Sequence, residues 1–295
     1  MYKTILLKDI KASEVQNFLN YAIAPRPICF ASTIDSKGNV NLSPFSYFNV
    51  FSVNPPVIIF SPSRRIRDNT TKHTFENLLE VPEVVVNIVT YNMVQQISLS
   101  SCEFPRGTDE FIKAGFTKEP SNIIKPPRVR ESPVQMECKV LEIKPLGIEG
   151  GAGNLVIAEV LMMHINENIL DKDGKIDQQK LELIARLGGN WYARINTDNL
   201  FEVEKPNTLS GIGIDNLPES VKHSNILTGN HLGQLANVHE LPVIDSSFED
   251  EKLKNIFQYY SLNPPEMENE LHLYAAALLN EGKVNDAWQV LLALA

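Results

Sequence analysis

The sequence is poor in cysteine. Its 295 residues include only Cys29, Cys102 and Cys138, which are far apart and form no C-x-x-C pair. An odd number of widely spaced cysteines argues against a disulfide framework and a cysteine-based zinc site, and it suits a reducing compartment. We therefore expect a cytoplasmic protein in which free cysteines serve as small apolar residues.

Several other patterns are also absent. No run of 18 uncharged apolar residues occurs, so we expect no membrane span. The first residues, MYKTILLKDIKASEV, lack the apolar segment and cleavage site of a signal peptide, so none is expected. The six histidines include no H-x-x-x-H pair, which argues against a metal site. No G-x-G-x-x-G follows a predicted strand, so the sequence shows no distinct dinucleotide motif.

Positive charge is scarce, especially late in the chain. The formal net charge is −9, and residues 207–295 hold four lysines against twelve acidic residues, a net of −8. Residues 1–206 are close to neutral. An acidic chain without a basic stripe is a poor nucleic-acid binder. The change in composition at Lys205-Pro206 predicts two domains, residues 1–206 and 207–295.

The first domain has the pattern of a mainly β protein with helices. Apolar, β-rich runs occur at residues 28–34, 57–60 and 84–90, and alternating runs occur at residues 134–146 and 155–165. Asp35 to Asn39 forms a predicted hairpin turn, with Gly38 where a positive φ is needed. The glycine cluster at residues 150–154 lies between two alternating strands, which favours another hairpin turn over a phosphate loop. This pattern predicts an antiparallel barrel with helical inserts, including a helix at residues 181–186.

One stretch, residues 41–74, carries the main candidate site. It reads NLSPFSYFNVFSVNPPVIIFSPSRRIRDNTTKHT. A strand-like run rich in Ser, Phe and Tyr covers residues 41–54, and Pro55-Pro56 makes a rigid turn. A short apolar strand at residues 57–60 then leads into a basic loop and a short helix. We interpret this order as a flat aromatic ligand site followed by its phosphate site.

The phosphate site rests on the start of that helix. A helix beginning near residue 70 directs free N–H groups and the positive end of its dipole outward. Lys72 would lie in the first turn, where a cation is favourable only beside an anion, and phosphate is the usual one. Ser61, Ser63 and Arg64 would add hydroxyls and a guanidinium. Two plainer readings stay open: Lys72 in water with Thr71 as an ordinary cap, and the aromatic side chains of residues 45–51 as barrel core.

Several ordered motifs resemble the flavin reductase-like, FMN-binding split-barrel family, in its flavoredoxin and monooxygenase reductase-component branch. The motifs are RPICFASTID (26–35), NLSPFSYFN (41–49), SVNPPVIIFSPS (52–63), KHT (72–74), DEFIKAGF (109–116), KPPRVRESPVQMECK (125–139) and RLGGNWY (186–192). The resemblance spans residues 15–205. It implies a six-stranded Greek-key barrel, a homodimer with FMN near the interface, and hydride transfer from NADH or NADPH to flavin.

The resemblance also implies residue roles. Residues 43–49 are similar to the segment that holds the isoalloxazine ring, from Ser43 to the nearest residues, Ser46, Tyr47, Phe48 and Asn49. The loop flanking the ribityl phosphate matches Ser61, Pro62, Ser63 and Arg64. Lys72 and Thr74 match the family's Lys-x-Thr, although His73 stands where related sequences usually carry Asp. Arg186 and Tyr192 would close the site, from the same subunit or its partner.

Two functions remain open at this point. The first is an NAD(P)H:FMN oxidoreductase that supplies reduced flavin to a monooxygenase or another electron acceptor. The second is a flavin-binding electron carrier without its own nicotinamide reaction. Either needs orientation and hydrogen bonds around a cofactor, and neither needs a protein nucleophile or a metal.

The C-terminal domain lies outside the resemblance. Residues 207–239 show little periodicity, whereas residues 250–260, 264–279 and 284–294 are predicted helices, the last two forming an antiparallel pair. A stabilising cap on the barrel or on the dimer partner, or an acidic docking surface, would account for this domain.

Overall fold

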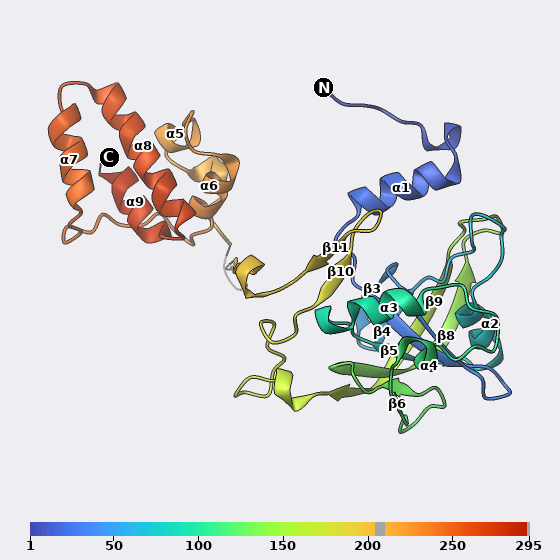
Figure 1. The fold of residues 1–295 in the computed structure, drawn as a ribbon. Helices are drawn as coiled ribbons and strands as arrows, with labels where there is room; N and C mark the ends of the chain where they lie inside the picture. Colours follow the sequence, from blue (N-terminus) through green and yellow to red (C-terminus); the bar gives the residue numbers. More distant parts are fainter. Residues whose placement is uncertain (204–209, 294–295) are drawn as a thin grey trace. The chain divides into compact units, whose positions relative to one another are not determined.

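The computed structural model describes residues 1–203 and 210–293. The chain forms two compact units, residues 1–201 and 202–295, which we describe separately (Figure 1). The boundary expected at Lys205-Pro206 lies outside the described residues. Among the residues that are described, no helix has both the length and the apolar character needed to cross a bilayer.

The first unit is built on an antiparallel sheet of seven strands in the order β2-β1-β5-β8-β9-β4-β3. Their bounds are β1 Cys29–Ile34, β2 Val40–Phe45, β3 Phe48–Val53, β4 Pro56–Phe60, β5 Glu83–Asn87, β8 Val134–Pro145 and β9 Asn154–Ile165. In the described part of the chain no ladder joins the edge strands β2 and β3, so the barrel is split and open. The resemblance implied six strands in a Greek key, and the observed sheet has seven.

Two predicted hairpins are present. Strands β1 and β2 pair antiparallel across the turn at Asp35, whose Oδ1 accepts hydrogen bonds from the N–H groups of Lys37 at 2.9 Å and Asn39 at 2.8 Å. Gly38 takes a φ of 89° there, which glycine adopts without strain. Strands β8 and β9 form the second hairpin across the glycine cluster. Its inner face adds Met136, Cys138 and Val156 to the buried core of the sheet.

The stretch expected as one strand, residues 41–54, is two strands that lie at opposite ends of the sheet. The chain leaves β2 after Phe45, bends at Ser46 and Tyr47, and enters β3 at Phe48. Phe45 is buried against Phe60 in the core, while Phe51 is exposed. The core reading of these aromatics therefore holds for Phe45 and not for Phe51, because the bend changes which face each residue occupies.

Helices and small hairpins fill the connections of the first unit. The helices are α1 Ala12–Ala22, α2 His73–Glu80, α3 Val94–Ser100 and α4 Glu110–Ala114, with 3-10 turns η1 Leu7–Asp9, η2 Tyr91–Met93, η3 Glu167–Ile169 and η4 Thr197–Asn199. The small strands are β6 Lys118–Glu119 with β7 Arg128–Val129, and β10 Ile184–Arg186 with β11 Tyr192–Arg194. The helix predicted at residues 181–186 is wrong, because Gly188 and Gly189 form a turn that pairs β10 with β11.

The second unit is helical. It contains η5 Ile214–Asn216, α5 Glu219–Lys222, α6 Gly229–Leu235, α7 Glu251–Tyr260, α8 Pro264–Asn280 and α9 Val284–Leu292. Its own apolar core surrounds the fully buried Trp288. The three helices predicted after residue 249 are confirmed, with Pro264 at the start of α8 and Gly282, at a φ of 75°, between α8 and α9. The two short helices before residue 240 had no periodic signal.

Candidate functional site

A cavity of about 510 Å³ opens beside the bend between β2 and β3. Its walls come from that bend, the loop after β4, the start of α2, the loop after α3, the end of α1 and the β10–β11 turn. The structure brings many of the sequence-predicted site residues together in this lining: Ser43, Ser46, Tyr47, Ser61, Ser63, Arg64, Lys72 and Arg186. The predicted ring segment and the predicted phosphate loop therefore form one cavity.

The remaining predicted residues do not line the cavity: Phe48, Asn49, Pro62, Thr74 and Tyr192. Phe48 packs partly buried against the core of the sheet. Asn49 is exposed, and its Oδ1 accepts a hydrogen bond from the Val50 N–H at 2.8 Å. Thr74 is 1% exposed, and its Oγ1 accepts a hydrogen bond from Asn41 Nδ2 at 2.8 Å. The side chain of Thr74 thus holds α2 against β2, away from the cavity.

A backbone contact joins the ring segment to the phosphate loop. The N–H of Ser61 donates to the carbonyl of Tyr47 at 2.9 Å. This contact fixes the start of the loop after β4 against the bend at Ser46 and Tyr47. A ligand that fills the cavity therefore meets hydroxyl groups from both segments.

The glycine turn between β8 and β9 supports the same loop from behind. The N–H of Arg64 donates to Ala152 O at 2.9 Å, and the N–H of Gly151 donates to Arg64 O at 3.1 Å. Asn154 donates its N–H to Ser61 Oγ and its Nδ2 to Pro62 O, both at 3.0 Å. A Cβ on Gly153 would lie 2.9 Å from Ser61 Oγ. Sequence reasoning identified this turn but not its contact with the loop, for which the dense glycines were the available signal.

Two side-chain polar groups on the cavity wall lack a partner in the part of the chain that the structure describes. The Oγ of Ser63 is buried and makes no hydrogen bond. The Lys72 side chain is half-buried, and its ammonium makes no hydrogen bond or ion pair within the described residues. A buried hydroxyl and a cation left in this way are costly unless a ligand satisfies them. Both side chains are suited to an oxyanion.

Helix α2 adds backbone donors to this wall. It begins at His73, slightly later than the sequence suggested, so Lys72 is its N-cap residue. In the described structure the N–H groups of His73 and Thr74 have no acceptor, as expected for the first residues of a helix. The positive end of the α2 dipole therefore lies at Lys72, on the wall of the cavity.

The cavity is strongly cationic although the chain is acidic. Its lining includes one carboxylate, Glu103, and six basic residues: Arg26, Arg64, Arg65, Arg67, Lys72 and Arg186. Burial and the nearby Arg65 guanidinium lower the pKa of Lys72 below its usual value. A bound anion would reverse this effect, because it would stabilise the charged ammonium. The lining therefore favours an anionic ligand.

Arg26 is a site residue that sequence reasoning missed. Its side chain is buried, and its Nη1 donates to the carbonyls of Asn20 at 2.6 Å and Ile23 at 2.7 Å. Its Nη2 donates to Leu187 O at 3.0 Å. The guanidinium thus connects the end of α1 to the β10–β11 turn, which lie side by side in Figure 1. An arginine between two prolines was the only local hint.

The β10–β11 hairpin places Arg186 at the cavity. Arg186 pairs with Tyr192 across the two strands, and its guanidinium lies 4.5 Å from the centre of the Tyr192 ring. Its Nη1 also donates to Trp191 O at 3.1 Å. Tyr192 therefore positions Arg186 without touching the cavity. Arg186 and Tyr192, both predicted to close the site, are thus in contact, but only Arg186 lines the cavity.

Residues 21–180 match the family model of the flavin reductase like domain. The chain belongs to the flavin reductase-like family. The matched region of this flavin reductase-like domain contains the bend, the loop after β4, the start of α2 and the glycine turn. Arg186 and the whole second unit lie outside it.

Curated relatives and solved structures agree with this assignment. An uncharacterised protein of Aquifex aeolicus (strain VF5) is 38% identical over 189 residues, which cover 64% of this chain and 94% of the relative. Nitrilotriacetate monooxygenase component B from Bacillus cereus is 31% identical, with a TM-score of 0.64, 69% of this chain covered and 99% of that one. The 2-nitrobenzoate 2-nitroreductase NbaA from Pseudomonas fluorescens is 25% identical, with a TM-score of 0.63 and coverages of 72% and 100%. About two thirds of this flavin reductase-like protein thus accounts for nearly the whole of each.

Proposed function

We propose that this protein binds FMN in the cationic cavity and transfers a hydride to it from NADH or NADPH. The observation that carries the proposal is the pairing of an unsatisfied anion site, Lys72 with Ser63 Oγ, and a hydroxyl-lined ring segment within one cavity. The family membership supports a flavin as the ligand. The cationic lining supports the phosphate-bearing flavin, FMN, over riboflavin.

The residues present fit FMN. Lys72, Ser63 and the first N–H groups of α2 would hold the phosphate, with the Ser61 hydroxyl beside them. Ser43, Ser46 and Tyr47 would lie along the ring and the ribityl chain. Arg64 would act mainly through its charge, because its guanidinium is already bound to Asn69 Oδ1 and Asn69 O, both at 2.6 Å. Phe48, Asn49, Pro62, Thr74 and Tyr192 would support these residues from outside the cavity.

Bound FMN would supply the hydride-accepting chemistry, so this chain needs no nucleophile of its own. The contribution of the protein is to fix the ring against the β2–β3 bend and to neutralise the phosphate. The Tyr47 hydroxyl donates to Asn20 Oδ1 at 3.0 Å, which holds the end of α1 beside the bend. Arg26 and Arg186 would add positive charge where the nicotinamide substrate enters.

A homodimer is part of the proposal. Helix α1 has no buried residue; Phe18 and Leu19 are exposed along it, and Ile23 is exposed directly after it. Strand β3 is an edge strand that exposes Phe51 and Val53. Exposed apolar groups on a helix and an edge strand are typical of surfaces covered by another subunit.

The likeness to a monooxygenase component B supports a role in supplying reduced flavin to a partner enzyme. In that role the reduced flavin would leave the cavity and react elsewhere. A flavin that stays bound would instead suit direct electron transfer to an acceptor.

Anaerobic reduction tests the function. Purified protein, FMN and NADH are mixed without oxygen, and the flavin absorbance at 450 nm is followed, then the same is done with NADPH. Rapid bleaching with one of the two nucleotides is expected, and no bleaching in protein-free controls. Bound flavin that neither nucleotide reduces would refute the reductase and favour an electron carrier, while failure to bind FMN would refute both.

A further inference from the structure

Glu103 occupies an unusual position for a carboxylate. It lies in the loop between α3 and α4 and is the only acidic side chain on the described lining of the cationic cavity. Its Oε1 accepts from Arg65 Nε at 3.0 Å, and its Oε2 accepts from Arg67 Nη2 at 2.8 Å. One carboxylate therefore bridges two arginines that face the proposed phosphate site.

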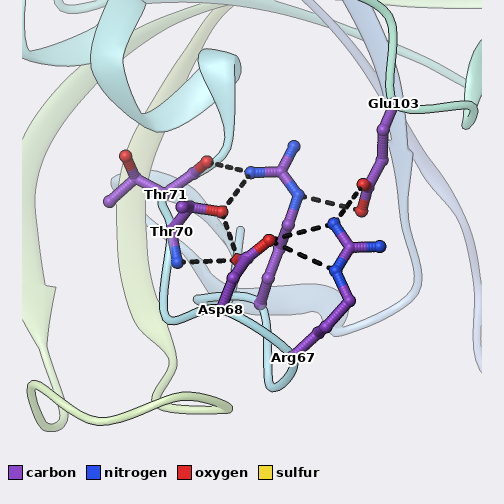
Figure 2. A network of polar contacts seen from close by, with 6 residues as sticks. Arg67, Asp68, Thr70, Thr71 and Glu103 are labelled. Carbon is purple, nitrogen blue, oxygen red and sulfur yellow. Dashed lines mark hydrogen bonds and ion pairs between the residues drawn. The ribbon is translucent and has the colours of Figure 1, made fainter.

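These contacts close into a ring of side chains (Figure 2). Arg67 Nη2 donates to Asp68 Oδ2 at 2.9 Å, and the Thr70 hydroxyl donates to Asp68 Oδ1 at 2.6 Å. Arg65 Nη1 in turn donates to Thr70 Oγ1 at 3.0 Å and to the carbonyl of Thr71. The ring contains two guanidinium and two carboxylate groups, so its net charge is zero. Only one of the two carboxylates, Glu103, faces the cavity.

In the described structure, Arg65 and Arg67 each have one guanidinium nitrogen that is free to donate a hydrogen bond to a ligand. Nη2 of Arg65 and Nη1 of Arg67 make no hydrogen bond with any described residue. Arg65 is firmly placed, because its side chain is mostly buried and Thr70 and Thr71 hold its other end. A phosphate beside Lys72 would have the free Nη2 of Arg65 to bind, but it would share that guanidinium with Glu103. The same phosphate would be repelled by Glu103 for as long as the carboxylate stays in place.

We propose that the Glu103 carboxylate competes with the flavin phosphate for the Arg65 guanidinium and so keeps FMN exchangeable. This inference rests on the proposed function and deepens it, because FMN would then be a substrate that binds and is released. Arg67 and Arg65 hold the pKa of Glu103 below its usual value, so the competing carboxylate stays charged at neutral pH. Because Thr70 and Thr71 hold Arg65 in place, the phosphate would have to share its guanidinium with the carboxylate.

The test measures FMN and riboflavin affinity by flavin fluorescence, and FMN release by stopped flow. Glu103→Gln keeps the shape of the side chain and removes its charge. We expect FMN to bind about tenfold tighter and to leave correspondingly more slowly, which is the effect of one charge-assisted hydrogen bond gained. Riboflavin affinity should not change, because riboflavin carries no phosphate. Glu103→Ala should show the same direction.

Asp68→Asn is the matched control. It removes a carboxylate from the same ring, but Asp68 does not line the cavity. The proposal expects FMN affinity to stay within about twofold in this variant. An equal gain in Asp68→Asn would show that breaking the ring matters and competition does not. Unchanged or weaker FMN binding in folded Glu103→Gln protein would overturn the proposal, and a wild type that binds no FMN would overturn the function instead.

Discussion

At the scale of single residues, Lys72 is the cation whose surroundings are least satisfied. It is half-buried and lies near Arg65, and both circumstances disfavour its charged form. Most other cations of the lining are already engaged: Arg26 by carbonyls, Arg64 by Asn69 and Arg65 by Glu103. Lys72 therefore gains most from a bound anion.

Lys72→Ala should weaken FMN binding about ten- to a hundredfold, because a hydrogen bond to a charged group contributes roughly 1.5–3 kcal/mol. Riboflavin binding should change little. Flavin fluorescence titration of both ligands checks this, and Lys37→Ala, on the exposed turn after β1, serves as a charge-matched control. Equal losses for FMN and riboflavin would show that Lys72 only supports α2.

The residues of the site were predictable where their contacts are local. Ser61, Ser63 and Lys72 lie within one short stretch that ends in a helix start, and this stretch alone points to an anion. Arg26 and Glu103 were not predictable, because their partners are distant in the chain. Arg26 bonds Leu187, 161 positions away, and Glu103 bonds Arg65, 38 positions away. Thr74 was assigned to the phosphate from a motif, whereas its side chain is turned toward Asn41.

At the scale of secondary-structure elements, the β8–β9 turn determines the shape of the phosphate loop. The two segments exchange backbone hydrogen bonds, and Asn154 holds both Ser61 and Pro62. Gly153 leaves room for the Ser61 hydroxyl because it has no side chain. The hairpin therefore has a second task besides connecting two strands.

Gly153→Ala should weaken FMN binding about tenfold while the fold is retained. The added Cβ would lie 2.9 Å from Ser61 Oγ, so the Ser61 hydroxyl has to leave its place and loses the hydrogen bond from Asn154 that orients the loop. Fluorescence titration and a thermal melt check both halves of the prediction. Gly229→Ala, where the new Cβ meets open space, is the control. Wild-type affinity in Gly153→Ala would mean that the loop position is unimportant.

Elements with a long, regular pattern were predictable. The alternating residues of β8 and β9, and the helices α7 to α9, follow the sequence within a few positions. Short segments were not: residues 184–186 became a strand because residues 192–194 lie across the turn as a partner. The bend at Ser46 was also missed, because only the separation of β2 and β3 to opposite edges of the sheet requires it.

At the scale of the whole molecule, the two units have separate apolar cores. The core of the second unit contains residues from Leu217 onward, and the cores of the first unit end at Ile184. The charge asymmetry seen in the sequence follows the same division, since the acidic excess lies in the second unit. From this asymmetry the sequence predicts two domains, while the number and order of strands came only from long-range pairing.

A chain that ends at Val203 should fold and bind FMN with an affinity within about twofold of the full chain. The reason is that the cavity lining and its supporting cores lie wholly within the first unit. Circular dichroism, a thermal melt and flavin titration of both proteins check this. A folded but flavin-free truncated protein would show that the second unit contributes to binding.

The Arg26 guanidinium has a consequence for any opening of the cavity. The guanidinium donates hydrogen bonds to the end of α1 on one side and to the loop at Leu187 on the other. The backbone of Arg26 also pairs with that of Arg186. If either α1 or the Leu187 loop moved away alone, the buried Arg26 guanidinium would lose part of its hydrogen-bond acceptors. The two flanks should therefore move together, and a ligand that enters between them requires the displacement of both.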